Sequence, residues 1–285
     1  MKYVLYNPLS GKGEAKKIVE VLFDGAELID MTTVGDMKEL CESLEGEDAL
    51  IISGGDGTLN RFVNLVDVER IKAPIFLLPI GTGNDFASDI GADNTGEPIE
   101  ITEYLRELPT VTVNGTEYKF INGVGYGIDG YCCEVGDKLK SEGKQPNYAL
   151  IAISGLLFHY KPCSAIVTVD GVEHEYKKVW IAPTMNGRYY GGGMIPTPEQ
   201  SRKDEEHKLS VMIFHDSSKI KTLAVFPSIF KGEHVKATKF VEILEGKEIS
   251  VKFTDPKPLQ IDGETILGVT EYAAHAYAPK MAMKM

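Results

Sequence analysis

The sequence lacks the features of membrane-spanning, disulfide-rich and nucleic-acid-binding proteins. Its longest apolar stretch, residues 149–158, is interrupted by Ser154 and Gly155 and falls well below the roughly 20 residues of a membrane span. The four cysteines form no Cys-x-x-Cys pair, which disfavours a disulfide framework or a zinc site. A net charge of −12 disfavours nucleic acid as the main partner, because phosphate backbones attract clustered Lys and Arg. With no signal-peptide pattern, we expect a cytoplasmic protein.

The pattern of apolar residues changes along the chain and predicts two domains. Residues 1–115 alternate short apolar runs with amphipathic stretches, which predicts an α/β domain with a parallel sheet covered on both faces. Residues 116–285 are predicted to form a mostly antiparallel β-sandwich. Its expected hairpin turns include residues 170–171 and 245–246, and the turn at 114–115 lies at the boundary. Helical insertions are expected at residues 147–158 and 219–230.

Two glycine-rich turns in the first domain predict a nucleotide site. Residues 53–58 (Ser-Gly-Gly-Asp-Gly-Thr) and 79–85 (Pro-Ile-Gly-Thr-Gly-Asn-Asp) each follow a short apolar run and precede a helix-like stretch. Glycine has no Cβ, so the backbone can bring several N–H groups against a phosphate, and the helix N-terminus adds a favourable dipole. Both turns fall at carboxyl ends of predicted strands, where open α/β sheets bind ligands. We therefore expect a polyphosphate ligand.

Three motifs of the first domain resemble the diacylglycerol kinase catalytic domain. They are residues 7–11 (Asn-Pro-Leu-Ser-Gly), 54–58 and 79–87, in that order, and the resemblance continues through residues 122–129, 191–194 and 262–264. The likeness covers nearly the whole chain. It implies an α/β domain and a β-sandwich domain with an ATP cleft between them, and an ATP-dependent lipid kinase that converts diacylglycerol to phosphatidic acid.

The resemblance also implies which residues bind ATP and Mg²⁺. Asp56 would be the magnesium partner, since Mg²⁺ prefers few carboxylates plus substrate phosphates; the alternative is an aspartate that stabilises its own turn. Glu206 is a second candidate metal ligand, although the residue after it is His207 where many bacterial members have a glycine. Elsewhere, at position 61, this chain has arginine where the family usually has an acidic residue. The residues expected to contact the nucleotide are Asn7, Ser10, Gly11, Gly54, Gly55, Gly57, Thr58, Gly81, Thr82 and Asn84.

Three carboxylates are expected to act on the lipid acceptor. By resemblance, Glu264 is the general base that accepts the proton of the lipid hydroxyl, and Asp262 orients it or binds metal through water. On the sequence alone, residues 262–264 are more typical of a hairpin turn than of a catalytic site, and only the resemblance reverses that order. Asp85 is assigned to positioning the substrate hydroxyl by likeness alone, because an acidic residue is common in the first turn of a helix.

A basic segment predicts peripheral contact with a membrane. Residues 219–239 contain five lysines, one glutamate and several large apolar residues, so this segment can lie on an anionic membrane surface. The alternative is a helix packed on the sandwich with a solvated rim of lysines. Two other functions stay open, a non-catalytic lipid- or nucleotide-binding regulator and an enzyme similar to NAD kinase, and so does a homodimer.

Overall fold

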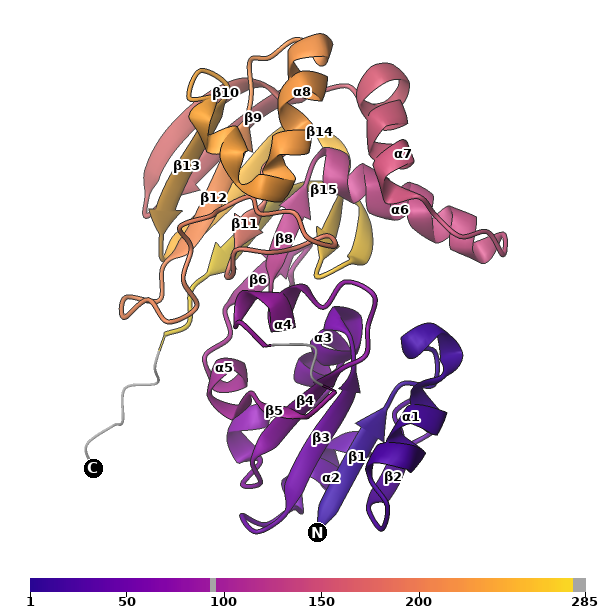
Figure 1. The fold of residues 1–285 in the computed structure, drawn as a ribbon. Helices are drawn as coiled ribbons and strands as arrows, with labels where there is room; N and C mark the ends of the chain where they lie inside the picture. The colour runs from indigo at the N-terminus through magenta and orange to yellow at the C-terminus, as the bar shows by residue number, and fades with distance from the viewer. Residues whose placement is uncertain (93–95, 279–285) are drawn as a thin grey trace, which may run out of the picture. The chain divides into compact units, whose positions relative to one another are not determined.

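The chain forms two compact units, which the computed structural model describes for residues 1–92 and 96–278. The first unit spans Met1–Leu108 and the second Pro109–Met285 (Figure 1). The boundary expected at 115/116 falls in the turn of the hairpin between β6 (Thr110–Val113) and β7 (Thr116–Lys119). Within the described ranges, no helix is long and apolar enough to cross a membrane.

The first unit has the predicted parallel sheet. Its strand order is β2-β1-β3-β4-β5; the first four strands are parallel, and β5 pairs antiparallel with β4. Every residue from Leu50 to Gly54 in β3 is buried, as expected of a strand covered on both faces. The strands are β1 (Lys2–Tyr6), β2 (Glu27–Asp30), β3 (Ala49–Gly54), β4 (Ile75–Pro79) and β5 (Ile99–Glu100).

Short helices follow the strands of this sheet. Amphipathic α1 buries Ala15 and Val19 in a cluster with Val4, Tyr6 and Ile51, and α3 buries Leu59, Phe62 and Val63. The helical segments of the unit are η1 (Gly11–Gly13), α1 (Ala15–Leu22), α2 (Met37–Glu42), α3 (Asp56–Leu65), η2 (Val68–Arg70), α4 (Asp85–Asp89) and α5 (Thr102–Arg106).

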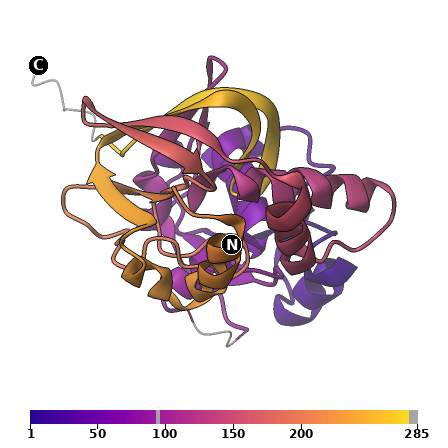
Figure 2. The same ribbon diagram turned by 90° about the horizontal axis from the view of Figure 1, so that it is seen from above.

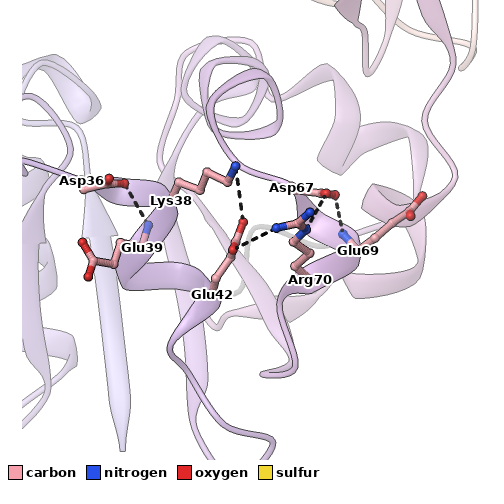
Figure 3. Close-up of polar contacts among 7 residues, drawn as sticks. All are labelled: Asp36, Lys38, Glu39, Glu42, Asp67, Glu69 and Arg70. Carbon is pink, nitrogen blue, oxygen red and sulfur yellow. Dashed lines mark hydrogen bonds and ion pairs between the residues drawn. The ribbon is translucent and has the colours of Figure 1, made fainter.

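A polar cluster joins α2 to η2 (Figure 3). Asp36 and Asp67 cap these two helices by accepting the amide N–H groups of Glu39, at 2.9 Å, and Glu69, at 3.3 Å. Between them, Arg70 forms ion pairs with Asp67 at 3.3 Å and with Glu42 at 3.7 Å. Arg70 is largely exposed, so each of these pairs stabilises the unit only weakly.

The second unit has the predicted antiparallel sandwich. Its strands are linked in the order β13-β12-β11-β8-β14-β15-β6-β7, and β9 pairs with both β10 and β14. β14 pairs with β9 through residues 249–253 and with β8 through residues 259–261, so this one long strand links β8 to the β9–β10 hairpin. The strands beyond the first hairpin are β8 (Gly123–Tyr126), β9 (Cys163–Val169), β10 (Val172–Val179), β11 (Thr184–Met185), β12 (Leu209–Phe214), β13 (Val241–Gly246), β14 (Glu248–Ile261) and β15 (Glu264–His275).

One predicted hairpin is wrong. The turns at 114–115 and 170–171 do connect paired strands, but β13 pairs with β12 rather than with β14. Gly246 does not have the positive φ of a tight hairpin turn, and a Cβ added to it would overlap the side chains of Val169 and Asp170. The Asp170 carboxylate accepts the N–H groups of Lys247 and Glu248, both at 2.8 Å, so the next strand starts against β9.

Both helical insertions expected in the second unit are present, and a third helix was not predicted. The unpredicted helix α6 follows β8 directly, and its Gly130 allows close packing on β14, since a Cβ there would lie 2.0 Å from the Pro258 carbonyl oxygen. Glycines lower helix propensity, which is why the pattern did not indicate it. The helical segments are α6 (Ile128–Ser141), α7 (Tyr148–Ser154), the π-helical turn η3 (Gly155–His159), α8 (Lys219–Val225), η4 (Phe226–Lys231) and η5 (Glu233–Lys236).

Candidate active site

The three turns that contain the predicted nucleotide-binding residues follow β1, β3 and β4. These strands are neighbours and parallel, so their carboxyl ends lie at the same edge of the sheet (Figure 1). The structure therefore brings together the predicted nucleotide-binding residues of all three turns. Side-chain contacts of Asp56 and Thr58 join the first turn of α3 to the other two turns.

Asp56 joins the β3 turn to the β4 turn. Its carboxylate oxygens accept the backbone N–H groups of Asp85 and Phe86, both at 2.9 Å, which are the first residues of α4. The aspartate therefore caps the neighbouring helix, a role that the sequence did not predict.

Thr58 joins the β3 turn to the β1 turn. Its hydroxyl lies 3.2 Å from that of Ser10. The β1 turn is closed by Asn7, whose side-chain oxygen accepts the Leu9 N–H at 3.0 Å, and by the left-handed backbone of Gly11 at φ +60°. The three turns are thus held together by side chains that also belong to the predicted site.

The glycines of the β3 turn have different roles. A Cβ on Gly54 would lie 2.4 Å from the Thr58 side chain, and one on Gly55 would lie 2.9 Å from the Gly81 Cα. Gly54 is therefore required by packing within the β3 turn, and Gly55 by packing against the β4 turn. A Cβ on Gly57 would meet no atom within 4 Å. Packing therefore does not account for this glycine, whereas close approach of a ligand to the N-terminus of α3 would.

Asn84 contributes an unpaired polar atom beside Gly81. Its backbone is left-handed at φ 52°, and its amide nitrogen donates to the Gly81 carbonyl at 3.0 Å. The side-chain oxygen is buried and has no hydrogen-bond partner within the described ranges. A buried acceptor in this state indicates a missing donor. Thr82, in the same turn, is exposed, and Asp85 is buried.

The candidate metal ligands do not form a closed metal site. In the part of the chain that the structure describes, no three His, Cys, Asp or Glu side chains cluster as a metal site. Asp56 fits Mg²⁺ in the manner of sites built from one protein carboxylate, phosphates and water. Glu206 instead forms an ion pair with Lys208, whose amide donates to Asp204 at 2.9 Å, and His207 adopts the left-handed φ of 54°.

In the second unit, Asp262 and Gly263 form the two-residue turn between β14 and β15. Both have positive φ, at 47° and 97°, which is the type I′ geometry of a tight hairpin. The Asp262 carboxylate accepts three backbone N–H groups, from Ile121 at 2.6 Å, Asn122 at 2.8 Å and Gly123 at 3.0 Å. This aspartate therefore fixes the hairpin tip to the first residue of β8 and to the two residues before it.

Glu264 is the exposed residue next to this fixed turn. It opens β15 opposite Ile261, and the next residue, Thr265, donates to Asp137 of α6 at 2.8 Å. The backbone at Glu264 is therefore held on both sides. A carboxylate placed in this way can accept a proton from a bound hydroxyl.

A buried carboxylate that the sequence did not predict lies behind the hairpin. Burial raises the pKa of Asp129 in α6 to about 6, although Tyr190 donates to the carboxylate at 3.2 Å and Gln260 also hydrogen-bonds to it. Gln260 in turn accepts the Gly263 N–H at 2.6 Å. A Cβ on Gly125 would overlap both Asp129 and Gln260. The glycines at positions 125 and 127 were the signal in the sequence for this close packing. Tyr190 and Gln260, which hydrogen-bond to Asp129, lie far from it along the chain.

Comparisons with known proteins agree with the geometry of both units. Residues 2–116 match the model of the diacylglycerol kinase catalytic domain, and residues 122–280 match that of the YegS C-terminal NAD kinase beta sandwich-like domain. The chain is 28% identical over 250 residues to the diacylglycerol kinase of Mycobacterium tuberculosis strain H37Rv, covering 81% of this chain and 79% of that protein. A crystal structure of a diacylglycerol kinase from Bacillus anthracis has the same fold, with a TM-score of 0.59, 17% identity, and coverage of 98% of this chain and 97% of that one.

Proposed function

Because the chain belongs to the family of diacylglycerol kinase-like lipid kinases, we propose that it transfers the γ-phosphate of ATP to diacylglycerol and so produces phosphatidic acid. The observation that carries the proposal is the first turn of α3. There, an aspartate and a threonine join three turns while Gly57 leaves the helix N-terminus open. The enzyme class follows from the family, and the choice of ATP and diacylglycerol is our proposal.

The nucleotide is proposed to bind along the three turns. The first-turn N–H groups of an α-helix have no acceptor within the helix, so those of α3 can donate to phosphate oxygens. Asn84 offers its unpaired side-chain oxygen as an acceptor. The other proposed contacts are with Asn7, Ser10, Gly11, Gly54, Gly55, Gly81 and Thr82.

Mg²⁺ is proposed to accompany the nucleotide. Asp56 would hold it, directly or through water, with the oxygens that also accept the Asp85 and Phe86 amides. The ion would neutralise charge on the phosphates. We keep Glu206 as a weaker candidate ligand for a separate structural ion, because Lys208 already neutralises its charge.

Glu264 is proposed to act as the general base and Asp262 as the residue that positions it. The acceptor oxygen attacks the terminal phosphorus, the bond from that phosphorus to the ADP oxygen breaks, and the hydroxyl proton passes to the Glu264 carboxylate. The turn is rigid because three amides bind Asp262. Asp85 is proposed to orient the acceptor hydroxyl.

The acceptor also determines where the enzyme works. Diacylglycerol lies in a bilayer, so we propose a cytoplasmic protein that associates peripherally with the membrane. The lysine-rich segment 219–239 supports this proposal, because lysines are attracted to anionic lipids.

The test is phosphate transfer from radiolabelled ATP into a total lipid extract, followed by identification of the labelled lipid. We expect labelled phosphatidic acid when diacylglycerol is present. Saturable ATP binding without any labelled product would favour a non-catalytic regulator, and label in NADP after addition of NAD would favour the NAD kinase alternative. Label in a different lipid would keep the kinase and replace the acceptor.

A further inference from the structure

Large apolar side chains are exposed together on one part of the second unit. In α7 and η3, Leu150, Ile153 and Phe158 are 63%, 43% and 75% exposed, and Ile220 at the start of α8 is 79% exposed. Single exposed apolar residues are ordinary on a protein surface. A group of them on neighbouring helices is typical of an interaction site.

These helical segments are neighbours in space. α8 packs against η3, and the Lys219 ammonium donates to the Leu157 carbonyl at 2.9 Å. Figures 1 and 2 show α7 and α8 side by side in two perpendicular views. We call the surface formed by Leu150, Ile153, Phe158 and Ile220 the α7–α8 face.

The charge of the two segments that form this face is opposite to that of the whole protein. Residues 148–161 and 219–231 contain no aspartate or glutamate, although the chain has 42 acidic residues and a net charge of −12. The same two segments carry four lysines, at positions 161, 219, 221 and 231. The partner that fits this combination of lysines and exposed apolar side chains has an anionic surface and an apolar interior.

We propose that the α7–α8 face docks the protein on an anionic phospholipid bilayer. The four apolar side chains enter the boundary between headgroups and acyl chains, and the lysines lie over the lipid phosphates. This inference rests on the proposed function, because a lipid acceptor is the reason that the protein meets a bilayer, and it deepens that function. It names the docking surface, which includes α7 and η3 in addition to the basic segment.

A second copy of the chain fits this face less well than a bilayer does. In a two-fold dimer the same patch meets itself, so the lysines of one copy would face those of the other. Like charges across an interface are unfavourable. A bilayer supplies negative charge and apolar depth together.

The test is co-sedimentation with vesicles of phosphatidylcholine and phosphatidylglycerol, without ATP. One variant combines Phe158→Ser and Ile220→Ser, and a second combines Lys161→Glu, Lys221→Glu and Lys231→Glu. We expect the charge variant to bind at least about 100-fold more weakly, since each lysine near an anionic surface contributes a factor of about five. Loss of the two apolar side chains should weaken binding about tenfold for each.

Matched controls separate this face from the general surface. Val21→Ser with Leu267→Ser removes apolar residues that are 76% and 60% exposed elsewhere, and Lys16→Glu, Lys17→Glu and Lys38→Glu make the same charge change in the first unit. Both controls should bind vesicles like the unsubstituted protein. Equal binding by the face variants, equal loss in the controls, or no vesicle binding by the unsubstituted protein would overturn the proposal.

Two further measurements keep this proposal distinct from the kinase assignment. If light scattering detects a dimer that the Phe158→Ser and Ile220→Ser substitutions dissociate, a second copy occupies the face and the bilayer proposal is overturned. The face variants should still phosphorylate a diacylglycerol dispersed in detergent. A protein that binds vesicles through this face but phosphorylates no lipid would refute the proposed function and support the docking surface.

Discussion

The first turn of α3 in one unit and the β14–β15 tip in the other place an aspartate in the same kind of contact. Asp56 accepts two backbone N–H groups from α4, and Asp262 accepts three from residues 121–123. An accessible residue follows each aspartate. After Asp56 comes Gly57, where an added Cβ would meet no atom within 4 Å, and shortly after Asp262 comes the exposed Glu264. The two aspartates therefore hold their turns in shape, and we propose that their neighbours meet the ligands.

The largest effect is expected at Glu264, for which we propose a chemical role and whose side chain is exposed. Glu264→Ala should lower kcat about a thousandfold, in the range typical of a lost general base, with the urea midpoint unchanged because the side chain is exposed. Kinase assays and urea unfolding on the same preparation measure both quantities. Val172→Ala, another exposed strand position, is the control. Turnover like that of the unsubstituted protein would remove Glu264 from the mechanism.

Asp56→Ala should reduce both activity and stability. Two amides of α4 lose a charged acceptor, so we expect about 3 kcal/mol less stability and, since the β4 turn is no longer held, activity about a hundredfold lower. Asp56→Asn retains one acceptor oxygen and should recover part of the stability but not the metal binding. Full activity in the folded alanine variant would contradict the assigned role.

The fold was largely predictable because its signals are local. Buried strands followed by glycine turns indicated the sheet of the first unit, and the turn at 170–171 indicated one hairpin of the second. The contacts of Asp56, Asp129 and Asp262 were not predictable, because each aspartate contacts residues far away along the chain, such as Gln260 for Asp129. The turn at 245–246 was misread for the same reason, since Asp170 holds the residues that follow it.

A smaller effect distinguishes the two kinds of glycine in the α3 turn. Gly57→Ala should leave the protein as stable as before or more stable, by up to about 1 kcal/mol, because Ala favours the helix and no atom lies within 4 Å. Its nucleotide affinity should fall about tenfold, since the added methyl meets the phosphate. Gly55→Ala is the contrast: its Cβ would meet the Gly81 backbone, so unfolding should show a loss. Unchanged nucleotide affinity in Gly57→Ala would contradict ligand approach at this turn.

The smallest effect on activity is expected at the third aspartate, Asp129. Here the effect of burial on the pKa outweighs the effect of the hydrogen bonds. The pKa of Asp129 is raised from 3.8 to about 6, so the folded state binds a proton more tightly than the unfolded chain does. The contribution of Asp129 to the free energy of unfolding therefore falls as the pH rises from about 4 to about 6, by up to about 3 kcal/mol at about 1.4 kcal/mol per unit. Asp129→Asn removes this dependence and should be more stable than the unsubstituted protein above pH 6.

Urea unfolding at several pH values measures this difference. Asp137→Asn, at a half-exposed position of the same helix, is the control and should keep the pH dependence of the unsubstituted protein. The kinase activity of Asp129→Asn should fall only a few-fold, because an amide can still accept from Tyr190 while Gln260 holds Gly263. A loss as large as that of Glu264→Ala would mean that Asp129 acts on the reaction itself, and the distinction between supporting aspartates and exposed reactive residues would then fail.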